Sequence, residues 1–298
     1  MSLQTTASVE ETGGGVVREA FQRLRRNPSA ITGFVLIVLF VLVALFAPLL
    51  APYDPKDVDL SQVPRAGEIP GPSAEHWLGV DELGRDELSR LLFGARQSLV
   101  IGVGSLLMGL VVGVLLGLLA GAFGGWVDTL IMRVVDMMLA VPGLLFAIAV
   151  AAMLGPSTTS VMIAIAVVTV PVFARLLRGQ MLAQRESDYV LAARSLGVRQ
   201  RDIVLRHVLP NSLTPVLVQG TLTLATAIID AAGLAFLGLS GNDPSTPEWG
   251  RMLADTQRYL SAAPQLAVFP GLAIVISALG FTLLGEAMRE ALDPKYRR

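Results

Sequence analysis

The chain has 298 residues, no cysteine and a formal net charge of −1 at pH 7. Hydrophobic residues make up 53% of it and charged residues 16%, whereas soluble domains carry about 25% charged residues. The lack of cysteine excludes disulfides, thiolate metal sites and a cysteine nucleophile. The near-neutral charge implies no general affinity for nucleic acid. The composition therefore predicts a protein that is embedded in a lipid bilayer.

Six apolar runs approach the roughly 20 residues that a helix needs to cross a bilayer. The first of them, Ile31–Leu50, follows some 28 polar residues and is longer than the roughly 7–15 apolar residues of a secretory signal. It therefore predicts a transmembrane helix rather than a cleaved signal. We predict an all-α integral membrane protein with six transmembrane helices, at about 30–51, 98–121, 130–154, 159–179, 212–232 and 266–288.

The charges of the hydrophilic segments predict the orientation of the chain, because short loops rich in lysine and arginine stay in the cytoplasm. Segment 174–211 holds seven arginines against three acidic residues, whereas segment 53–97 holds five basic residues against nine acidic ones. Six spans and a cytoplasmic N-terminal tail, residues 1–28, put 53–97 and 233–264 outside. The C-terminal Lys295–Arg298 then lies inside, so that both termini are cytoplasmic.

The order of these segments predicts how the chain is organised. A first transmembrane helix, 29–51, leads into an extracytoplasmic segment, 52–97, and residues 98–292 hold the other five helices. Five prolines between positions 52 and 72 favour a looped excursion. Its end, Glu82–Arg96, carries leucines near helical spacing and predicts a separate surface helix. Pro142 is expected to kink the third span.

A stripe of glycines marks the second predicted span. Gly109, Gly113, Gly117 and Gly121 recur at a constant interval of four, which places them on one helical face. Such a face lets another helix approach closely. The partner is either another helix of this chain, the reading we favour, or a helix of a second subunit.

Segment 186–210 is the most informative part of the chain, because it is polar and ordered and lies between two spans. Tyr189, Ala193 and Leu196 lie at i, i+4 and i+7, which predicts one apolar stripe of a helix. The small side chains of Ala192 and Ala193 would let a partner surface come close.

The sequence also predicts where this helix of segment 186–210 ends and how the chain continues after it. Gly197 stands where a helix C-terminus favours a left-handed residue. A second short helix, about Arg199–Leu209, should then run to Pro210, which opens the fifth span. Taken alone, these features also fit an amphipathic helix lying at the membrane surface.

The order Ala192-Ala193, Gly197 and Leu209-Pro210 resembles the cytoplasmic coupling motif of ABC importer permeases. Over about residues 20–295 the chain resembles the second permease subunit of dipeptide, oligopeptide and nickel ABC importers. Four further blocks carry this resemblance: His76–Asp86 with Leu88–Arg90, Gly124–Asp128 with Met132–Asp136, Phe236–Leu239 with Pro247–Gly250, and Leu284–Arg289 with Leu292–Pro294.

The resemblance implies the type I ABC importer permease fold and a set of partners. They are a homologous second permease, two cytoplasmic ATPase subunits or domains that bind ATP and magnesium, and an extracytoplasmic substrate-binding protein. The expected location is the inner membrane of a bacterial or archaeal cell. The residues expected to couple to the ATPases are Tyr189, Ala192, Ala193, Gly197, Leu209 and Pro210.

Two residues depart from the pattern of the family. Leu191 stands where the motif usually has glutamate, and His207 where it usually has isoleucine, so one polar contact to an ATPase is in doubt. His207 is interpreted as a solvated residue. Because His76 and His207 are predicted on opposite faces of the membrane, they cannot share a metal, and no metal site is predicted.

Several other side chains are candidates for functional positions. Asp230 lies near the outer end of the fifth span, where a carboxylate either lines a pathway or makes a structural pair. Phe236 and Trp249, from the third block, are candidates for the pathway or its outer gate. Arg133 and Asp136 are three residues apart and predict an ion pair on one helix.

No catalytic residue is predicted. The chain has no Gly-x4-Gly-Lys-Ser/Thr loop for nucleotide phosphates, so ATP would be hydrolysed by another polypeptide. The resulting hypothesis is a permease subunit of an ATP-driven importer for di- or oligopeptides. The alternatives are an importer of nickel or another small solute, a stand-alone secondary transporter or channel, and a scaffold without transport.

Overall fold

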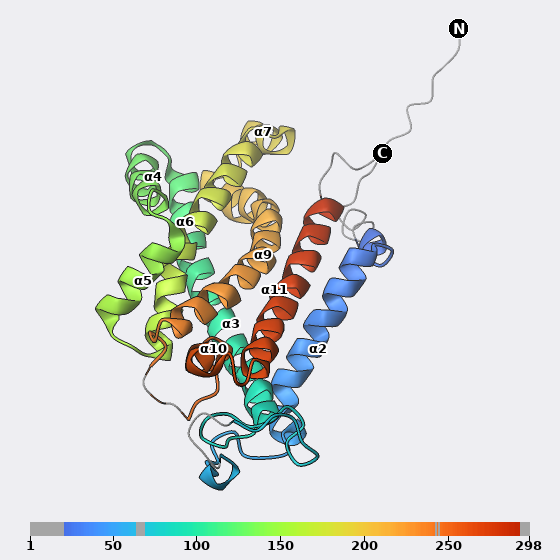
Figure 1. Cartoon of the computed structure of the whole chain (residues 1–298). Helices are drawn as coiled ribbons and strands as arrows, with labels where there is room; N and C mark the ends of the chain where they lie inside the picture. The colour runs from blue at the N-terminus through green and yellow to red at the C-terminus, as the bar shows by residue number, and fades with distance from the viewer. Residues whose placement is uncertain (1–20, 64–68, 242, 244, 293–298) are drawn as a thin grey trace.

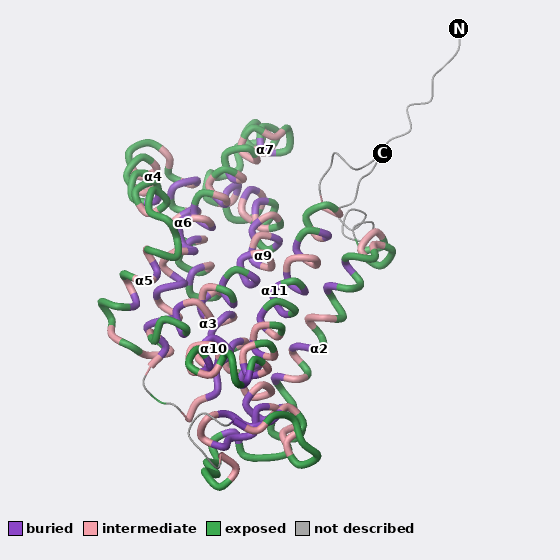
Figure 2. The backbone as a smooth tube through the Cα atoms, in the orientation of Figure 1, coloured by how far each residue is buried: buried purple, intermediate pink, exposed green. Residues whose placement is uncertain are grey.

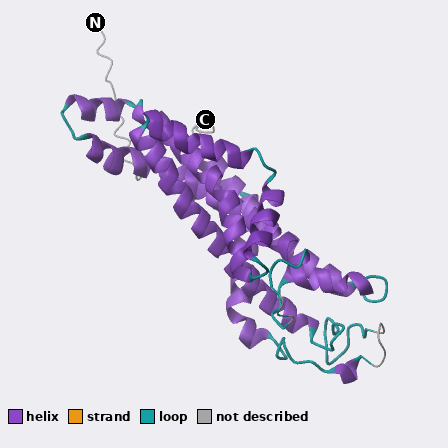
Figure 3. Cartoon of the chain, turned by 90° about the vertical axis from the view of Figure 1, so that its left-hand side faces the viewer, coloured by secondary structure: helices purple, strands orange, loops and turns teal. Residues whose placement is uncertain are grey.

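In the computed structural model of the protein, residues 21–63, 69–241, 243 and 245–292 are described, and their regular structure is helical apart from one isolated bridge between Val80 and Asp86 (Figures 1 and 3). The main helices are α2 (Pro28–Leu50), α3 (Glu87–Phe123), α4 (Gly125–Leu139), α5 (Gly143–Leu154), α6 (Thr158–Arg185), α7 (Asp188–Ser195), α8 (Gln200–Asp202), α9 (Leu209–Phe236), α10 (Trp249–Asp255) and α11 (Gln265–Leu292). Three short pieces complete them: η1 (Leu60–Gln62), η2 (Ile203–Val208) and η3 (Thr256–Tyr259). The prediction for Lys295–Arg298 and most of the 1–28 tail lies outside the described residues.

Five stretches of the described residues are long and apolar enough to cross a membrane: α2, α3, α6, the run from α8 to α9, and α11. The predicted third span, 130–154, differs from the others. It is divided into α4 and α5, whose axes meet at 94°. Pro142 stands immediately before α5, where it removes a backbone donor and disfavours a helical residue before it. The pair makes a sixth span only if the two bent halves are taken together.

The surface helix predicted at Glu82–Arg96 is wrong. The structure has one helix, α3, that begins at Glu87 and continues through the second span to Phe123. Its 37 residues extend for about 55 Å, well beyond the hydrocarbon core. The Asp86 carboxylate accepts a hydrogen bond from the Ser89 N–H (2.7 Å) and thereby caps the first turn. The leucine spacing read as a surface helix is therefore the first turns of this long helix.

The second short helix predicted at Arg199–Leu209 is also not separate. Helix α8 leads into the π-helical turn η2, which continues without a break into α9 at Leu209. Pro210, the second residue of α9, directly follows this π-helical turn and cannot donate the backbone hydrogen bond that a helix would otherwise make at its position. The chain therefore enters this span as a continuous helical rod rather than through a hinge.

The glycines of α3 lie against α6. A Cβ built on Gly109 would come within 1.9 Å of the Thr169 Oγ1, and one built on Gly113 within 2.6 Å of the Phe173 Cβ. Gly117 and Gly121 continue the same contact toward the end of α6. The stripe thus serves close packing within this chain, which is the first of the two readings of the sequence.

We expect Gly113→Leu to break this packing. The Phe173 Cβ and the Val170 carbonyl oxygen leave no room for a side chain at this position, and overpacking of this kind costs about 1–3 kcal/mol or more. The yield of monodisperse protein in detergent should fall several-fold, together with its melting temperature. Gly179→Ala is the matched control, because a Cβ at Gly179 meets nothing within 4 Å. Equal behaviour of the two variants would contradict the packing role.

The bundle has two differently built ends (Figure 1). Helices α4 and α7 lie at one end, and the segment between α2 and α3 lies with α10 at the other. The faces of α7 and α4 at the first end are largely exposed (Figure 2). The chain thus separates a predominantly helical tip from an end made mainly of loops.

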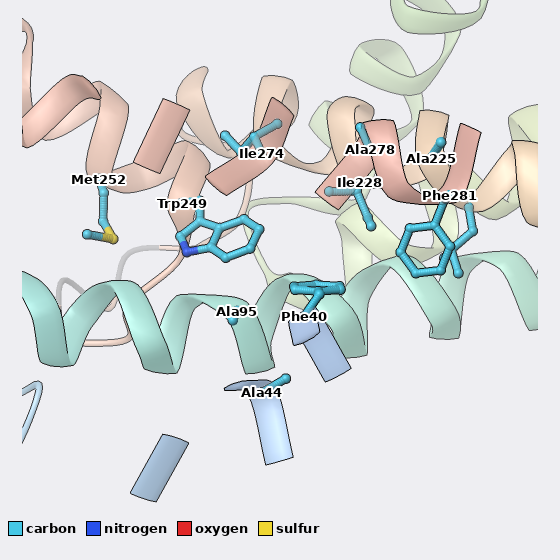
Figure 4. Packing of buried hydrophobic residues seen from close by; sticks show 11 residues of the cluster. Phe40, Ala44, Ala95, Ala225, Ile228, Trp249, Met252, Ile274, Ala278 and Phe281 are labelled. Carbon is cyan, nitrogen blue, oxygen red and sulfur yellow. The ribbon is translucent and has the colours of Figure 1, made fainter. Parts of the chain in front are cut away.

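Trp249 belongs to the core and not to a pathway. Its side chain is 3% exposed and lies beside Phe40, with ring centroids 5.5 Å apart, in a cluster contributed by α2, α3, α9, α10 and α11 (Figure 4). The Trp249 Nε1 donates to the Leu91 carbonyl oxygen (2.9 Å), and the ring fills the space beside Gly94. Trp249 was predicted to lie in the pathway or its outer gate; its ring is instead packed among core residues of this chain, where burial stabilises a large aromatic ring.

Candidate functional site: the tip formed by residues 186–210

Helix α7 ends in a well-defined cap. Gly197 has φ = +76°, its N–H donates to the Arg194 carbonyl oxygen (2.9 Å), and the Val198 N–H reaches back to the Ala193 carbonyl oxygen (3.1 Å). These two bonds make a Schellman motif with Gly197 as its left-handed residue. The left-handed conformation that the sequence predicted at Gly197 is therefore present, and the chain reverses sharply after α7.

Two residues fix α7 to the bundle. Val190 is buried in a cluster with side chains of α6, η2 and α9, among them Leu177 and Val208. The Tyr189 hydroxyl donates to the Gln184 Oε1 (2.7 Å) and accepts from the Asn211 Nδ2 (3.3 Å). Helix α7 is thus attached at once to the end of α6 and the start of α9.

The side of α7 that faces away from the bundle is apolar and exposed (Figure 2). We call Leu191, Ala192, Leu196 and Val198 the α7 face; Leu196 is 83% exposed. Around it stand exposed arginines, Arg194, Arg199, Arg201 and Arg206. An apolar patch with a polar rim is typical of a protein interaction site.

The predicted stripe Tyr189, Ala193 and Leu196 needs correction. Tyr189 and Leu196 are exposed, but Ala193 is half-buried and packs against the cluster around Val190. Since Val190 points into the bundle, Ala192, two residues further along the helix, lies on the opposite side. Of the two small residues, Ala192 is therefore the one that leaves room for a partner.

The junction between the tip and α9 is rigid. Ile203, Val204 and Val208 of η2 are buried in the same cluster. The Asn211 Nδ2 donates to the His207 carbonyl oxygen (2.8 Å), and the Ser212 Oγ donates to the Val208 carbonyl oxygen (2.8 Å). A displacement of α7 would therefore pass to α9 through packed side chains. Leu209 packs against this cluster, and Pro210 is exposed.

Ion pairs hold α4 beside the same end of α6. The Arg178 Nε and Nη2 donate to the two carboxylate oxygens of Asp128, both at 2.6 Å, and Arg175 pairs with Asp136. The predicted pair between Arg133 and Asp136 on one helix is thus replaced by a pair between two helices. The periodicity within α4 could not reveal this, because the competing cation comes from α6.

Arg185, the last residue of α6, connects this helix to the end of α3. Its guanidinium donates to the carbonyl oxygens of Gly121 (2.8 Å) and Ala122 (3.2 Å). These are among the last carbonyl groups of α3, which have no partner within the helix. The end of α6 therefore contacts α3, α4, α7 and α9, so a force on α7 can pass through α6 to these neighbouring helices.

The opposite end is held by buried charges that the sequence analysis missed. Arg85 and Arg90 are 2% and 1% exposed, and both lie beside the Asp81 Oδ2, with their Nε atoms at 2.6 and 3.3 Å. The Asp86 Oδ1 lies 2.9 Å from the His76 Nδ1. These residues belong to one of the blocks that carry the resemblance, but nothing in their local spacing indicated that their charges are buried. Buried charges need partners, and here they tie the loop to α3.

Glu248 lines a polar cavity of about 300 Å³ at this end, between the loop that precedes α6 and the loop that precedes α10. Its side chain is almost entirely buried, and burial raises its pKa from the usual 4.5 to about 7, against the smaller effects of Ser240 and Arg251. The Arg251 Nη1 donates to the Gly241 carbonyl oxygen (2.8 Å).

We expect Glu248 to make stability depend on pH. Because the folded-state pKa is raised, the folded state binds the proton more tightly. Stability is therefore highest below pH 4.5 and is lost as the pH rises through about 7, by about 3 kcal/mol in total. Glu248→Gln should raise the melting temperature in detergent at pH 8 and have little effect at pH 5. A pH dependence that survives in the variant would contradict this assignment.

The other two candidates for the pathway lie on α9. Asp230 is half-buried, and Phe236, the last residue of α9, is exposed. Asp230 is six residues before the end of this helix, which is about 9 Å along its axis. Both lie toward the end of α9, whereas the 186–210 segment leads into the start of this helix.

Residues 113–298 match the family "Binding-protein-dependent transport system inner membrane component". The chain belongs to this family. Residues 16–66 match the N-terminal transmembrane domain of oligopeptide transport permease C. The chain therefore has the two parts expected from the resemblance, a permease core and an added first helix.

Curated relatives cover almost the whole chain. It is 45% identical over 280 residues to the dipeptide transport system permease protein DppC of Alkalihalophilus pseudofirmus, with 94% of this chain and 90% of the relative aligned. It is 46% identical, with the same coverage, to the glutathione transport system permease protein GsiD of an Escherichia coli strain. The protein is accordingly an ABC importer permease subunit of the dipeptide and oligopeptide type and not itself the ATPase.

Solved structures show the fold. A chain of the inward-facing MetNI methionine ABC transporter superposes with a TM-score of 0.57 at 18% identity, covering 69% of this chain and 97% of that one. A second crystal form gives a TM-score of 0.55 at 19% identity, covering 68% and 96%. The all-helical type I importer permease fold that the sequence predicted is confirmed.

Proposed function

We propose that this chain is the second membrane subunit of an importer that takes peptides into the cell. Support for a peptide substrate comes from its relatives, which are named as permeases for dipeptides and for glutathione. A homologous second permease would complete the pathway, and an extracytoplasmic binding protein would deliver the peptide. The chain contributes binding surfaces and movement, while ATP and magnesium are bound by two partner ATPases.

The geometry of the tip is the observation that carries the coupling role. The α7 face is apolar, exposed and rimmed by arginines, while Val190 and Tyr189 on the other side of α7 are fastened to α6 and α9. Such an element is suited to receive a partner and to move together with the bundle. Closure of the ATPases would displace α7, and the continuous η2–α9 rod would carry the movement toward the opposite end.

The orientation follows from the charges at the two ends. The tip lies in the arginine-rich segment 174–211, and the loop end lies in the acidic segment 53–97. Because basic loops remain cytoplasmic, we assign the tip to the cytoplasm and the loop end to the outside of a bacterial or archaeal cell membrane. Both termini are assigned to the cytoplasm on the same ground.

Uptake into cells of the native host tests this function. A strain without the chain, with and without a restored copy, is supplied with labelled dipeptide, oligopeptide, glutathione or Ni²⁺. We expect restored uptake of at least one peptide, and its loss when cellular ATP is depleted while the membrane potential is maintained. Restored uptake of Ni²⁺ alone would overturn the peptide assignment, and uptake without ATP would overturn the importer mechanism.

A further inference from the structure

One side of α9 near the loop end differs in character from the rest of the apolar surface. Ala227, Ala231 and Leu234 are buried on one side of the helix. Thr226, Asp230 and Gly233 fall at i, i+4 and i+7 on the other side, where Thr226 is exposed and the other two are half-buried. We call Thr226, Asp230 and Gly233 the α9 lane.

The α9 lane is more polar than the exposed surfaces of α2 and α11. Between Phe34 and Leu49 the exposed residues of α2 are all apolar, and so are those of α11 between Val268 and Leu279. A lipid-facing surface disfavours a carboxylate, because a charge within the bilayer costs several kcal/mol. The lane is therefore poorly suited to face hydrocarbon chains.

Asp230 has no cation beside it in the part of the chain that the structure describes. Among the described residues it makes no hydrogen bond and no ion pair, and neither α5 nor α9 contains lysine or arginine. A half-buried carboxylate without a partner is costly. A positively charged group that reached the carboxylate from outside the described part of the chain would offset this cost.

The neighbours of Asp230 leave space for a ligand. Thr226 and Gly233, one turn away on either side, are small. A Cβ on Gly233 would meet only the Leu144 Cδ1 of α5, at 3.9 Å. A ligand backbone can therefore approach the carboxylate with its ammonium group, and the apolar Leu144 beside the lane can contact a side chain of the ligand.

We propose that Asp230 binds the α-ammonium group of the peptide as it passes through the membrane. This inference rests on the proposed peptide import. Peptides of different sequence share only their backbone and termini, so a single carboxylate among small residues recognises a feature common to all of them. A charge-assisted hydrogen bond of this kind is stronger than a neutral one. Because the lane has no second charged side chain, the peptide would be bound by one such bond only and could be released.

Accessibility is tested first, in the complete importer purified with its partners. The chain has no cysteine, so Asp230→Cys gives a single reactive position in this chain, whose labelling is read by mass spectrometry of this chain alone. Leu279→Cys on the apolar face of α11 is the control. We expect a water-soluble methanethiosulfonate to modify Asp230→Cys at least 10-fold faster than Leu279→Cys, and transported peptide with ATP to slow that modification. No modification, or a crosslink from this position to the second permease, would show that the lane is covered by protein and would overturn the proposal.

Recognition is tested by uptake into proteoliposomes at saturating binding protein and peptide. A peptide with a free ammonium group is compared with its N-acetylated form, after binding of both forms to the binding protein has been measured. We expect Asp230→Asn to lower maximal uptake of the free peptide about 10-fold while leaving that of the acetylated peptide unchanged, and Asp230→Glu to restore the difference. An equal loss for both peptides would overturn the ammonium site, whereas failure of the unsubstituted importer to transport either peptide would instead contradict the proposed function.

Discussion

Ala192→Arg should abolish recovery of the ATPase with this chain while leaving the chain folded. Ala192 is exposed on the side of α7 opposite the buried Val190, so an arginine there disturbs no contact within the chain. In a close-packed interface with a partner, however, it would place a long charged side chain where only a methyl group fits. An uncompensated buried charge of this kind costs about 3–5 kcal/mol, enough to weaken binding by two orders of magnitude or more.

The measurement for Ala192→Arg is co-purification in mild detergent, with the melting temperature of the chain recorded in parallel. Ala192→Ser is the matched control, because it keeps the side chain small and should retain the ATPase. Ala193→Arg should behave differently: Ala193 packs against the bundle, so this variant should lower the melting temperature as well. Undiminished recovery of the ATPase with Ala192→Arg would show that the α7 face is not the docking surface.

Gly197→Val should uncouple transport while leaving membrane insertion intact. Gly197 has φ = +76°, a conformation that a β-branched residue adopts only with strain, of about 1–3 kcal/mol. No atom lies within 4 Å of a Cβ at this position, so the effect arises from backbone conformation and not from a clash. Valine would open the Schellman cap and change the direction in which the chain leaves α7.

The Gly197 variants are compared by peptide uptake, by stimulation of ATP hydrolysis and by the amount of chain in the membrane. Gly197→Asn is the control, since asparagine adopts the left-handed conformation at low cost; it should keep most of the uptake. Gly197→Val should reduce uptake at least 10-fold at an equal amount of chain. Normal uptake in the valine variant would mean that the geometry of this turn does not matter for coupling.

Sequence periodicity was sufficient for the helical architecture but not for the helix boundaries. The apolar run of α3 was evident, yet the leucine spacing at Glu82–Arg96 was read as a separate surface helix that carries the charged residues Glu87 and Arg90. Both are buried in the structure, because the loop before α3 supplies their surroundings. Such long-range partners leave no trace in local spacing. The break between α4 and α5 was signalled by Pro142, but its 94° angle depends on how the two halves pack.

The candidate site, too, was predicted only in part from the sequence. The left-handed Gly197 follows from the rule that helices end in glycine, and it is present. Which side of α7 faces the bundle could not be derived, because Val190 with Ala193 and Ala192 with Leu196 both make apolar pairs at helical spacing. The contacts of Val190 with α6 and η2 decide it. Likewise, Trp249 was singled out by its sequence block, but only the packing against Phe40 and Gly94 shows that it is a core residue.

The most direct test of the central claim is purification of the tagged chain from its native host in mild detergent, followed by mass spectrometry of the proteins that accompany it. If the 186–210 segment couples this chain to ATPases, the preparation contains an ATPase, a homologous second permease and a binding protein, and the ATPase is lost from the Ala192→Arg preparation while the second permease remains. Recovery of the chain alone, folded and active in transport without ATP, would contradict the account.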